Sequence, residues 1–278
     1  MHCEIILIGN ELLIGKIQDT NGLWIIQQLV PLGIHISRIT TIEDNLSIIA
    51  QTLHEAIQRK PQYIFTSGGL GPTFDDMTLE GVSRGLCPPR TLIENQTALE
   101  MVRQSYERRF KNIPGRDPNL TPARRKMAQI PTDAVPLSNR EGAAPGVLIE
   151  IHETDVTTKL ICLPGVPGEL KAIFEDHVLP EVKKAIKQDH FYQCGFIFQD
   201  LGESKFTELI YQIKDQYPKI WIKTHPRKRD KFEVELHLTS FASEAEIIPQ
   251  MQELYQKLKT HVLQSKGIIT EESPLPSQ

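Results

Sequence analysis

The residues best suited to chemistry lie in a glycine-rich segment that ends in two carboxylates. This segment runs from Ser67 to Asp76 and reads Ser-Gly-Gly-Leu-Gly-Pro-Thr-Phe-Asp-Asp. Its glycines allow positive φ angles and a close approach of the backbone to a ligand. Successive free amides ahead of a helix suit a phosphate or a carboxylate group. The segment therefore predicts a loop that binds a phosphorylated molecule.

The two carboxylates, Asp75 and Asp76, stand at the end of this loop. Carboxylates beside a phosphate would repel it unless a divalent cation lay between them, so the pattern predicts metal-assisted chemistry. The alternative is a simple turn in which one of the two aspartates is a helix N-cap. The loop lacks both the Gly-Lys-Ser/Thr ending of a P-loop and the GxGxxG order of a dinucleotide fold.

Further acidic residues follow two other predicted strands. Glu11 and Asp19, with Lys16 between them, come after the apolar run 4–8, and Asp44 comes after the predicted strand 34–42. Open α/β sheets bind ligands at the carboxyl ends of their strands, so these residues are candidates for the same site. The alternative for Asp44, and for Asp19 or its neighbour, is an N-cap of the helix that follows.

The elements that must position these residues repeat in units of about 30 residues. The binding loop follows the apolar run 63–66, which predicts a buried parallel strand. Strand, helix, strand, helix, strand, helix in this order indicates a parallel, doubly wound α/β sheet with helices on both faces. We predict an α/β domain over 1–185, a small α+β domain over 190–265 and a flexible tail over 266–278.

Composition excludes several classes of protein. The 278 residues carry a formal net charge of −4, which gives no electrostatic reason to expect nucleic acid or an anionic membrane as a partner. No apolar run reaches the roughly 18 residues of a membrane span, and the N-terminus lacks a signal-peptide pattern. The four cysteines form no CxxC pair, so we expect ordinary buried thiols in a reducing cytoplasm.

Two basic clusters leave alternatives open. The first cluster is typical of a solvated face, and the alternative is that its side chains contact substrate phosphates. It comprises Arg108, Arg109, Lys111, Arg116, Arg124, Arg125 and Lys126. The second, between Lys223 and Lys231, suggests RNA, but residues 190–262 hold ten Lys/Arg and ten Asp/Glu and lack a GxxG loop. We therefore expect no nucleic-acid partner.

Several segments together resemble the molybdopterin-binding-like (MoaB/MogA-like) domain of the CinA (competence/damage-inducible) family. The matching segments are 9–13, Gly15, 19–21, 44–45, 67–78, 142–146 and 163–170. They lie in order over about residues 4–180. The same domain resembles the N-terminal part of eukaryotic FAD synthases, and the unit after residue 190 is similar to the KH-like domain of CinA proteins. The sequence shows no counterpart of their C-terminal nicotinamide-nucleotide deamidase domain, so deamidation is not inferred.

The resemblance implies a three-layer α/β/α core that binds a phosphorylated heterocycle or dinucleotide. It also implies metal-dependent hydrolysis of the pyrophosphate bond of a nucleotide such as ADP-ribose or FAD. In molybdopterin-handling relatives, acidic residues that match Asp19, Asp44 and Asp76 line the active site. One departure is the order Ser-Gly-Gly-Leu-Gly, where molybdopterin enzymes typically have Thr-Gly-Gly-Thr-Gly, and it favours the CinA-like and FAD-synthase-like branch.

We therefore predict a metal-dependent nucleotide pyrophosphatase with Asp44, Asp76, Asp19 and Glu11 as catalytic residues. Asp44 and Asp76 would hold a divalent cation (Mg²⁺, Mn²⁺ or Co²⁺). The predicted substrate-binding residues are Gly9, Asn10, Lys16, Asn21, Ser67, Gly68, Gly69, Leu70, Gly71, Pro72, Thr73, Asp75, Gly142, Pro145, Gly146, Pro164 and Gly165. The alternative is a protein that binds molybdopterin or a nucleotide without turnover. We further expect a cytoplasmic homodimer with a small-molecule substrate and no membrane partner.

Overall fold

The computed structural model describes the chain except for residues 112, 114–116, 187–188, 229–231 and 276–278. It divides into two compact units. Unit 1 comprises residues 1–29 and 35–185, and unit 2 comprises residues 30–34 and 186–278. No helix among the described residues combines the length and the apolar character needed to cross a membrane.

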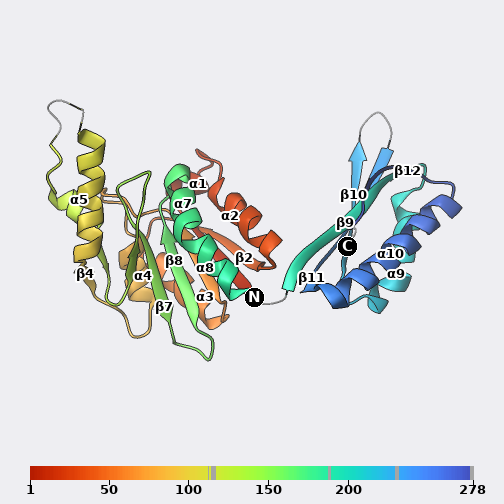
Figure 1. Cartoon of the computed structure of the whole chain (residues 1–278), viewed down its shortest axis with the longest axis horizontal. Coiled ribbons are helices and arrows are strands. Elements are labelled where there is room, and N and C mark those ends of the chain that lie inside the picture. The colour runs from red at the N-terminus through yellow and green to blue at the C-terminus, as the bar shows by residue number, and fades with distance from the viewer. Residues whose placement is uncertain (112, 114–116, 187–188, 229–231, 276–278) are drawn as a thin grey trace. The chain divides into compact units, whose positions relative to one another are not determined.

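Unit 1 is built on a six-stranded sheet with the order β2-β1-β3-β8-β7-β6 (Figure 1). Its strands are β1 (His2–Ile8), β2 (His35–Ile42), β3 (Tyr63–Ser67), β6 (Val135–Leu137), β7 (Gly146–Ile151) and β8 (Thr158–Leu163). The strands β2, β1, β3 and β8 are parallel, whereas β7 pairs antiparallel with β8 and β6. Two short strands, β4 (Leu92–Glu94) and β5 (Gln129–Pro131), form a separate ribbon. The prediction of a mostly parallel α/β sheet is confirmed.

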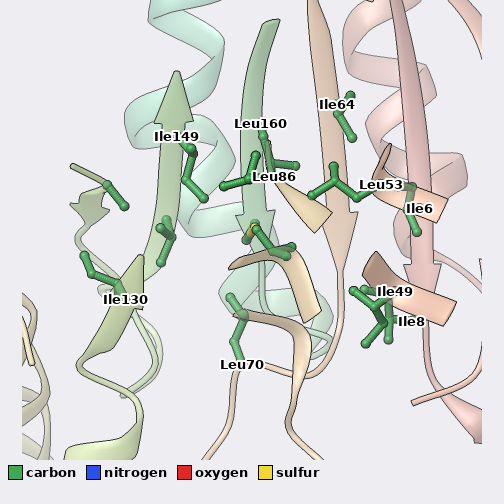
Figure 2. Packing of buried hydrophobic residues seen from close by; sticks show 14 of the residues in the cluster. Ile6, Ile8, Ile49, Leu53, Ile64, Leu70, Leu86, Ile130, Ile149 and Leu160 are labelled. Atoms are coloured by element: carbon green, nitrogen blue, oxygen red, sulfur yellow. The ribbon is translucent and has the colours of Figure 1, made fainter. Parts of the chain in front are cut away.

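Helices cover both faces of this sheet and make the unit three-layered (Figure 1). The helical segments of the unit are α1 (Asn10–Leu13), α2 (Asn21–Leu29), α3 (Leu46–Gln58), α4 (Thr78–Gly85), α5 (Gln96–Phe110), α6 (Pro122–Lys126), α7 (Pro167–Ile173), the π-helical turn η2 (Phe174–Val178) and α8 (Leu179–Ala185). Successive strand residues point to opposite faces. Ile64 therefore belongs with Ile49 and Leu53 of α3 to one buried cluster (Figure 2), while Phe65 on the other face meets Phe174 with ring centroids 5.6 Å apart.

Unit 2 is an antiparallel sheet with the order β10-β11-β9-β12 and helices packed against it. Its strands are β9 (Asp189–Gln199), β10 (Trp221–Lys228), β11 (Phe232–Ser243) and β12 (Ile268–Ser273). Its helical segments are α9 (Glu203–Ile213), η3 (Lys214–Gln216) and α10 (Glu244–Gln264), and the short η1 (Val30–Leu32) groups with this unit. A second small domain with an antiparallel sheet is thus present.

The predicted flexible tail over 266–278 is wrong for the residues of β12. This strand pairs antiparallel with β9, and Ile269 packs against the core of unit 2. The Glu272 carboxylate accepts hydrogen bonds from the Tyr255 hydroxyl and the Lys259 ammonium, each at 2.7 Å. The polar composition of this segment predicted a tail, because the groups that hold β12 in place lie on β9 and α10 and are not visible in its own sequence. Residues 276–278 lie outside the described part of the chain.

The prediction of buried thiols holds for three of the four cysteines. Cys3, Cys162 and Cys194 are buried, whereas Cys87 is exposed. Cys87 differs because it follows α4 in a turn before Pro88, at the surface of the unit.

Candidate functional site

The candidate site is a cavity of about 590 Å³ at the carboxyl ends of the parallel strands of unit 1. The strand order places β2 on one side of β1 and β3 on the other, so the chain reverses direction across the sheet between β1 and β3. Crevices at such a reversal are the usual ligand sites of open α/β sheets. The residues that follow β1, β2, β3 and β8 all contribute to the wall.

The glycines of the binding loop are required by its packing. Gly68 and Gly69 have φ angles of 115° and 66°. A Cβ on Gly68 would lie 2.1 Å from the carbonyl oxygen of Ile8, and a Cβ on Gly69 would lie 2.2 Å from Oγ1 of Thr78. The Gly68 amide donates to the carbonyl of Leu163 at 3.0 Å. The loop therefore lies directly on β1 and on the start of α4.

That last hydrogen bond corrects one part of the prediction. The Gly68 amide is already satisfied by Leu163 and is not free to bind a phosphate. Within the described part of the chain, the amides of Gly69, Leu70 and Gly71 donate to no protein group. These three amides are the ones that the loop can offer to an anion.

Neither aspartate of the loop caps a helix. The N-cap of α4 is Met77, and no side chain makes a cap hydrogen bond there. Instead, one oxygen of Asp76 accepts from the amide of Thr73 at 2.8 Å, and the Thr73 hydroxyl contacts both carboxylates. The bond from Thr73 lowers the pKa of Asp75. Both carboxylates line the cavity, so the capping alternative for this pair is wrong.

Asp44 also lines the cavity and is free of any capping role. The N-cap of α3 is the next residue, Asn45, whose side chain accepts from two amides of the first turn. The Asp44 carboxylate instead accepts from the amide of Asn10 at 2.8 Å. Burial raises the pKa of Asp44, the Asn10 hydrogen bond opposes the rise, and the charges of Glu11, Asp75 and Asp76 add to it.

Asp19 differs from the other carboxylates because it caps a helix. Its Oδ1 accepts from the amides of Asn21 at 3.0 Å and Gly22 at 3.1 Å, at the start of α2. The residue lines the cavity, but one of its oxygens is committed to this cap. The capping interpretation that the sequence left open therefore applies to Asp19.

Asn21 joins three of the loops that form the site. Its Nδ2 donates to Oγ of Ser67 at 2.9 Å and to the carbonyl of Gly165 at 2.8 Å. It is 8% exposed, and its Oδ1 is buried with no partner among the described residues. The start of α2 and the ends of β3 and β8 are thus tied together by one side chain.

Seven predicted substrate-binding residues do not line the cavity. They are Gly9, Asn10, Lys16, Thr73, Gly142, Pro145 and Gly146. The backbone amide of Asn10 donates a hydrogen bond to the Asp44 carboxylate, and the backbone amide of Thr73 donates one to the Asp76 carboxylate. Gly142 and Gly146 are glycines for packing, because a Cβ on Gly142 would meet the Glu169 carboxylate and a Cβ on Gly146 would meet Ile173. Lys16 is an exposed residue on the surface.

The structure adds wall residues that the sequence did not place in the site. Tyr106 and Arg109 come from α5, Met127 follows α6, and Glu169 comes from α7. Of these, Arg109 belongs to the basic cluster and Glu169 to the segment 163–170 that resembles the family, whereas Tyr106 and Met127 had no signal in the sequence. The guanidinium of Arg124 lies 4.0 Å from the centre of the Tyr106 ring.

The other members of that basic cluster do not line the cavity. Arg125 pairs with Glu94, and the Lys126 ammonium donates to the carbonyl of Thr73. Arg116 lies outside the described residues. Solvated or paired surface positions thus account for most of the cluster, and Arg109 is the exception.

No group of three or more His, Cys, Asp or Glu side chains among the described residues has the geometry to hold a metal ion. The carboxylates of Asp44 and Asp76 nevertheless line one cavity, and the charges of Asp76, Glu11 and Asp75 all raise the pKa of Asp44. Such mutual repulsion suits a cation whose remaining ligands are phosphate oxygens and water, as Mg²⁺ commonly has.

Comparisons with known proteins agree with this architecture. A family model described as "Probable molybdopterin binding domain" matches residues 4–184. Protein PH0439 of Pyrococcus horikoshii is 36% identical over 245 residues, which cover 88% of this chain and 91% of that protein. A protein of Metallosphaera sedula is 34% identical over 271 residues, covering 96% and 94% of the two chains.

A solved structure is similar to about two thirds of this chain. It is the crystal structure of the protein CinA, of unknown function, from Thermoplasma acidophilum. The TM-score is 0.57 at 32% sequence identity, and the match covers 66% of this chain and 99% of that one. The family model, which matches residues 4–184, extends over the part of the chain that contains the cavity.

Proposed function

The chain belongs to the family of "Probable molybdopterin binding domain" proteins, and from this premise we propose that unit 1 binds a phosphorylated heterocyclic compound. The ligand would be a pterin or a nucleotide, held in the cavity at the carboxyl ends of the parallel strands. The volume of about 590 Å³ falls within the range of small-molecule sites.

The observation that carries this proposal is the geometry of the binding loop. Gly68 and Gly69 have positive φ angles and let the loop lie directly against β1 and α4. The amides of Gly69, Leu70 and Gly71 have no protein acceptor among the described residues. Free amides next to the start of a helix stabilise a phosphate group. Arg109, the one Lys or Arg in the described wall, would add a positive charge.

A divalent cation fits the charge balance of the cavity. The wall holds the carboxylates of Asp44, Asp75 and Asp76, which would repel a phosphate. Asp44 and Asp76 would hold the cation, which would neutralise the phosphate and stabilise negative charge that develops on it. The amide of Asn10 orients Asp44, and the amide of Thr73 orients Asp76.

Calorimetric titration tests the proposal. ADP-ribose, FAD, GDP and inorganic pyrophosphate are titrated into the protein with and without Mg²⁺, Mn²⁺ or Co²⁺. We expect binding that strengthens with the cation, and at least a tenfold loss of this strengthening in Asp76→Asn. Asp75→Asn is the comparison variant, and we expect a smaller loss because Asp75 is exposed and bonded only through Thr73. Failure of all four compounds to bind would reject the proposal.

Hydrolysis of a pyrophosphate bond is a second candidate, favoured by the carboxylates of Asp44, Asp75 and Asp76 that line the cavity beside the amides of the binding loop. Asp44 and Asp76 would hold the cation, which would stabilise the negative charge that develops on the phosphate. A water oxygen would attack one phosphorus of ADP-ribose or FAD, the bridging P–O bond would break to give AMP and a second phosphate ester, and the proton of the water would pass to solvent. Release of AMP, measured by chromatography, tests this step. Binding of the same compounds without AMP release would leave the protein as a binding module.

Other expectations stay predictions. They are the homodimer, the cytoplasmic location, the absence of a nucleic-acid partner, the relation to FAD synthases and the KH-like character of unit 2.

A further inference from the structure

One part of the cavity wall differs in chemistry from the binding loop and the aspartates. It comes from α5, from the segment that follows α6, from the 143–144 turn and from α7. Its members are Tyr106, Arg109, Met127, Ala143, Ala144 and Glu169. An aromatic ring and small apolar groups with few polar side chains form the usual wall for a planar heterocycle.

A buried hydrogen bond fixes the position of the Glu169 carboxylate. Its Oε2 accepts from Nδ2 of Asn139 at 2.7 Å, and Asn139 is 7% exposed. Asn139 is itself fixed, because it donates to the carbonyl of Ala144 and accepts from the amides of Glu141 and Gly142. The buried amide therefore holds the carboxylate in one orientation.

The space for this carboxylate depends on a glycine. A Cβ on Gly142 would lie 2.0 Å from the carboxyl carbon of Glu169. The hydroxyl of Ser105, on α5, donates to the carbonyl of Gly142 at 2.6 Å and fixes the loop against that helix. The same helix brings Tyr106 and Arg109 into the wall.

Glu169 is not accounted for by a structural ion pair. Among the described residues no Lys, Arg or His lies within 4.0 Å of its carboxylate. Burial raises its pKa, while the Asn139 hydrogen bond and the charge of Arg109 lower it. A carboxylate that is partly desolvated in a cavity makes strong hydrogen bonds to any donor that reaches it.

We propose that Glu169 selects ligands whose ring presents two adjacent N–H donors, as guanine and pterin do. An ionised carboxylate only accepts hydrogen bonds, so it pairs with the ring N–H and the neighbouring amino group of these compounds. Adenine presents an unprotonated ring nitrogen beside its amino group, and that lone pair would face the carboxylate. A site built around such a pair rejects the ligand that lacks it. This inference rests on the proposed function.

A comparison of three nucleotides distinguishes the contributions of the two N–H donors to binding. GDP has both, IDP keeps the ring N–H but lacks the amino group, and ADP lacks the ring N–H. Each is titrated calorimetrically, with Mg²⁺, into the parent, into Glu169→Gln and into Glu141→Gln. Glu141 is the matched control because it lies next to Gly142, in the loop that contacts Glu169, and because it is exposed and does not line the cavity.

We expect the parent to bind GDP about 10- to 100-fold more tightly than ADP, with IDP between them, because a bidentate hydrogen-bond pair discriminates against a base that lacks one of its donors. In Glu169→Gln the GDP affinity falls to the level of ADP or below it, while the ADP affinity does not fall. Gln keeps an oxygen for Asn139, so the melting temperature should stay within about 2 °C. Glu141→Gln should match the parent.

Two results would overturn the inference and leave the proposed function in place. One is equal or tighter binding of ADP than GDP by the parent. The other is full retention of the GDP preference in Glu169→Gln. If neither the nucleotides nor inorganic pyrophosphate bind to the parent, the proposed function fails and this inference fails with it.

Discussion

Replacement of Gly68 by alanine should strongly destabilise unit 1, by an amount that follows from the contacts of the loop. The new Cβ would lie 2.1 Å from the carbonyl oxygen of Ile8, so the loop must move away from β1 by about 1 Å. That movement breaks the bond from the Gly68 amide to Leu163 and the bond from Thr78 to the Gly68 carbonyl.

Each buried group left without a partner costs about 1–3 kcal/mol, and the positive φ costs a Cβ-bearing residue about 1 kcal/mol more. We therefore expect the free energy of unfolding to fall by about 3–7 kcal/mol. Two control variants separate these contributions. Gly15→Ala has φ 70° and no atom within 4 Å of its Cβ, so it should cost about 1 kcal/mol. Gly168→Ala has neither problem and should be neutral or slightly stabilising.

The assay is urea unfolding followed by tryptophan fluorescence in a Trp221→Phe background. The chain has two tryptophans, one in each unit, and Trp24 packs edge-on against Phe174 in unit 1. With Trp221 replaced, the signal reports unit 1 alone, and the linear extrapolation yields its free energy of unfolding. If Gly68→Ala loses no more stability than Gly15→Ala, the close approach of the loop to β1 is refuted.

Three further predictions concern other residues. Because the folded pKa of Asp44 lies above its ordinary value of 3.8, the ionised group opposes folding as pH rises through the raised pKa. Without cations, the melting temperature of Asp44→Asn should therefore be higher than that of the parent at pH 7 and equal to it below pH 3.8. A calorimetric scan in which Asp44→Asn melts below the parent at pH 7 would contradict this. Asn21→Ala should cost about 2 kcal/mol and weaken nucleotide binding at least tenfold, whereas Asn45→Ala, which removes only a cap, should cost about 1 kcal/mol and leave binding unchanged. Glu272→Ala should speed hydrogen exchange of the β12 amides while costing under about 1 kcal/mol, and unchanged exchange would show that Tyr255 and Lys259 do not hold this strand.

The fold of unit 1 was predictable because its strands carry a local signal. Short runs of β-branched and other apolar residues, each followed by a glycine or an acidic residue and then by an apolar-periodic helix, indicate a parallel sheet. The same signal places the segments after β1, β2 and β3 at one edge, and the cavity lies there. The binding loop and its aspartates were found in this way.

Choices between neighbouring residues were not predictable. Asp44 and Asn45 are both good N-cap residues, and the sequence cannot say which one adopts the extended conformation before α3. In the structure Asn45 has φ −141° and ψ 124° and makes the cap, which leaves Asp44 for the cavity. The opposite outcome occurs at α2, where Asp19 makes the cap.

Residues whose role depends on distant partners were also missed. Glu169 lies in the segment 163–170 that resembles the family, close to the predicted binding residues Pro164 and Gly165, but nothing in that segment marks its carboxylate as part of the site. Its position depends on Asn139 and Gly142, about 30 residues earlier in the chain. Likewise, β12 exists because β9 offers it an edge, which its own polar sequence does not show.

The bond from Asn21 to the carbonyl of Gly165 has a consequence for how this protein acquires its site. The two residues are 144 positions apart, and closing a loop of that length costs about 2 kcal/mol more chain entropy than closing one of ten residues. A nascent chain that emerges from the ribosome as far as β7 can therefore pair β1 with β2 and β3 but has no completed cavity. The residues that follow β8 complete the cavity wall only when β8 has paired with β3. A ligand that occupies the cavity thus binds the finished unit in preference to any partly folded one, and its binding energy stabilises the whole sheet against unfolding.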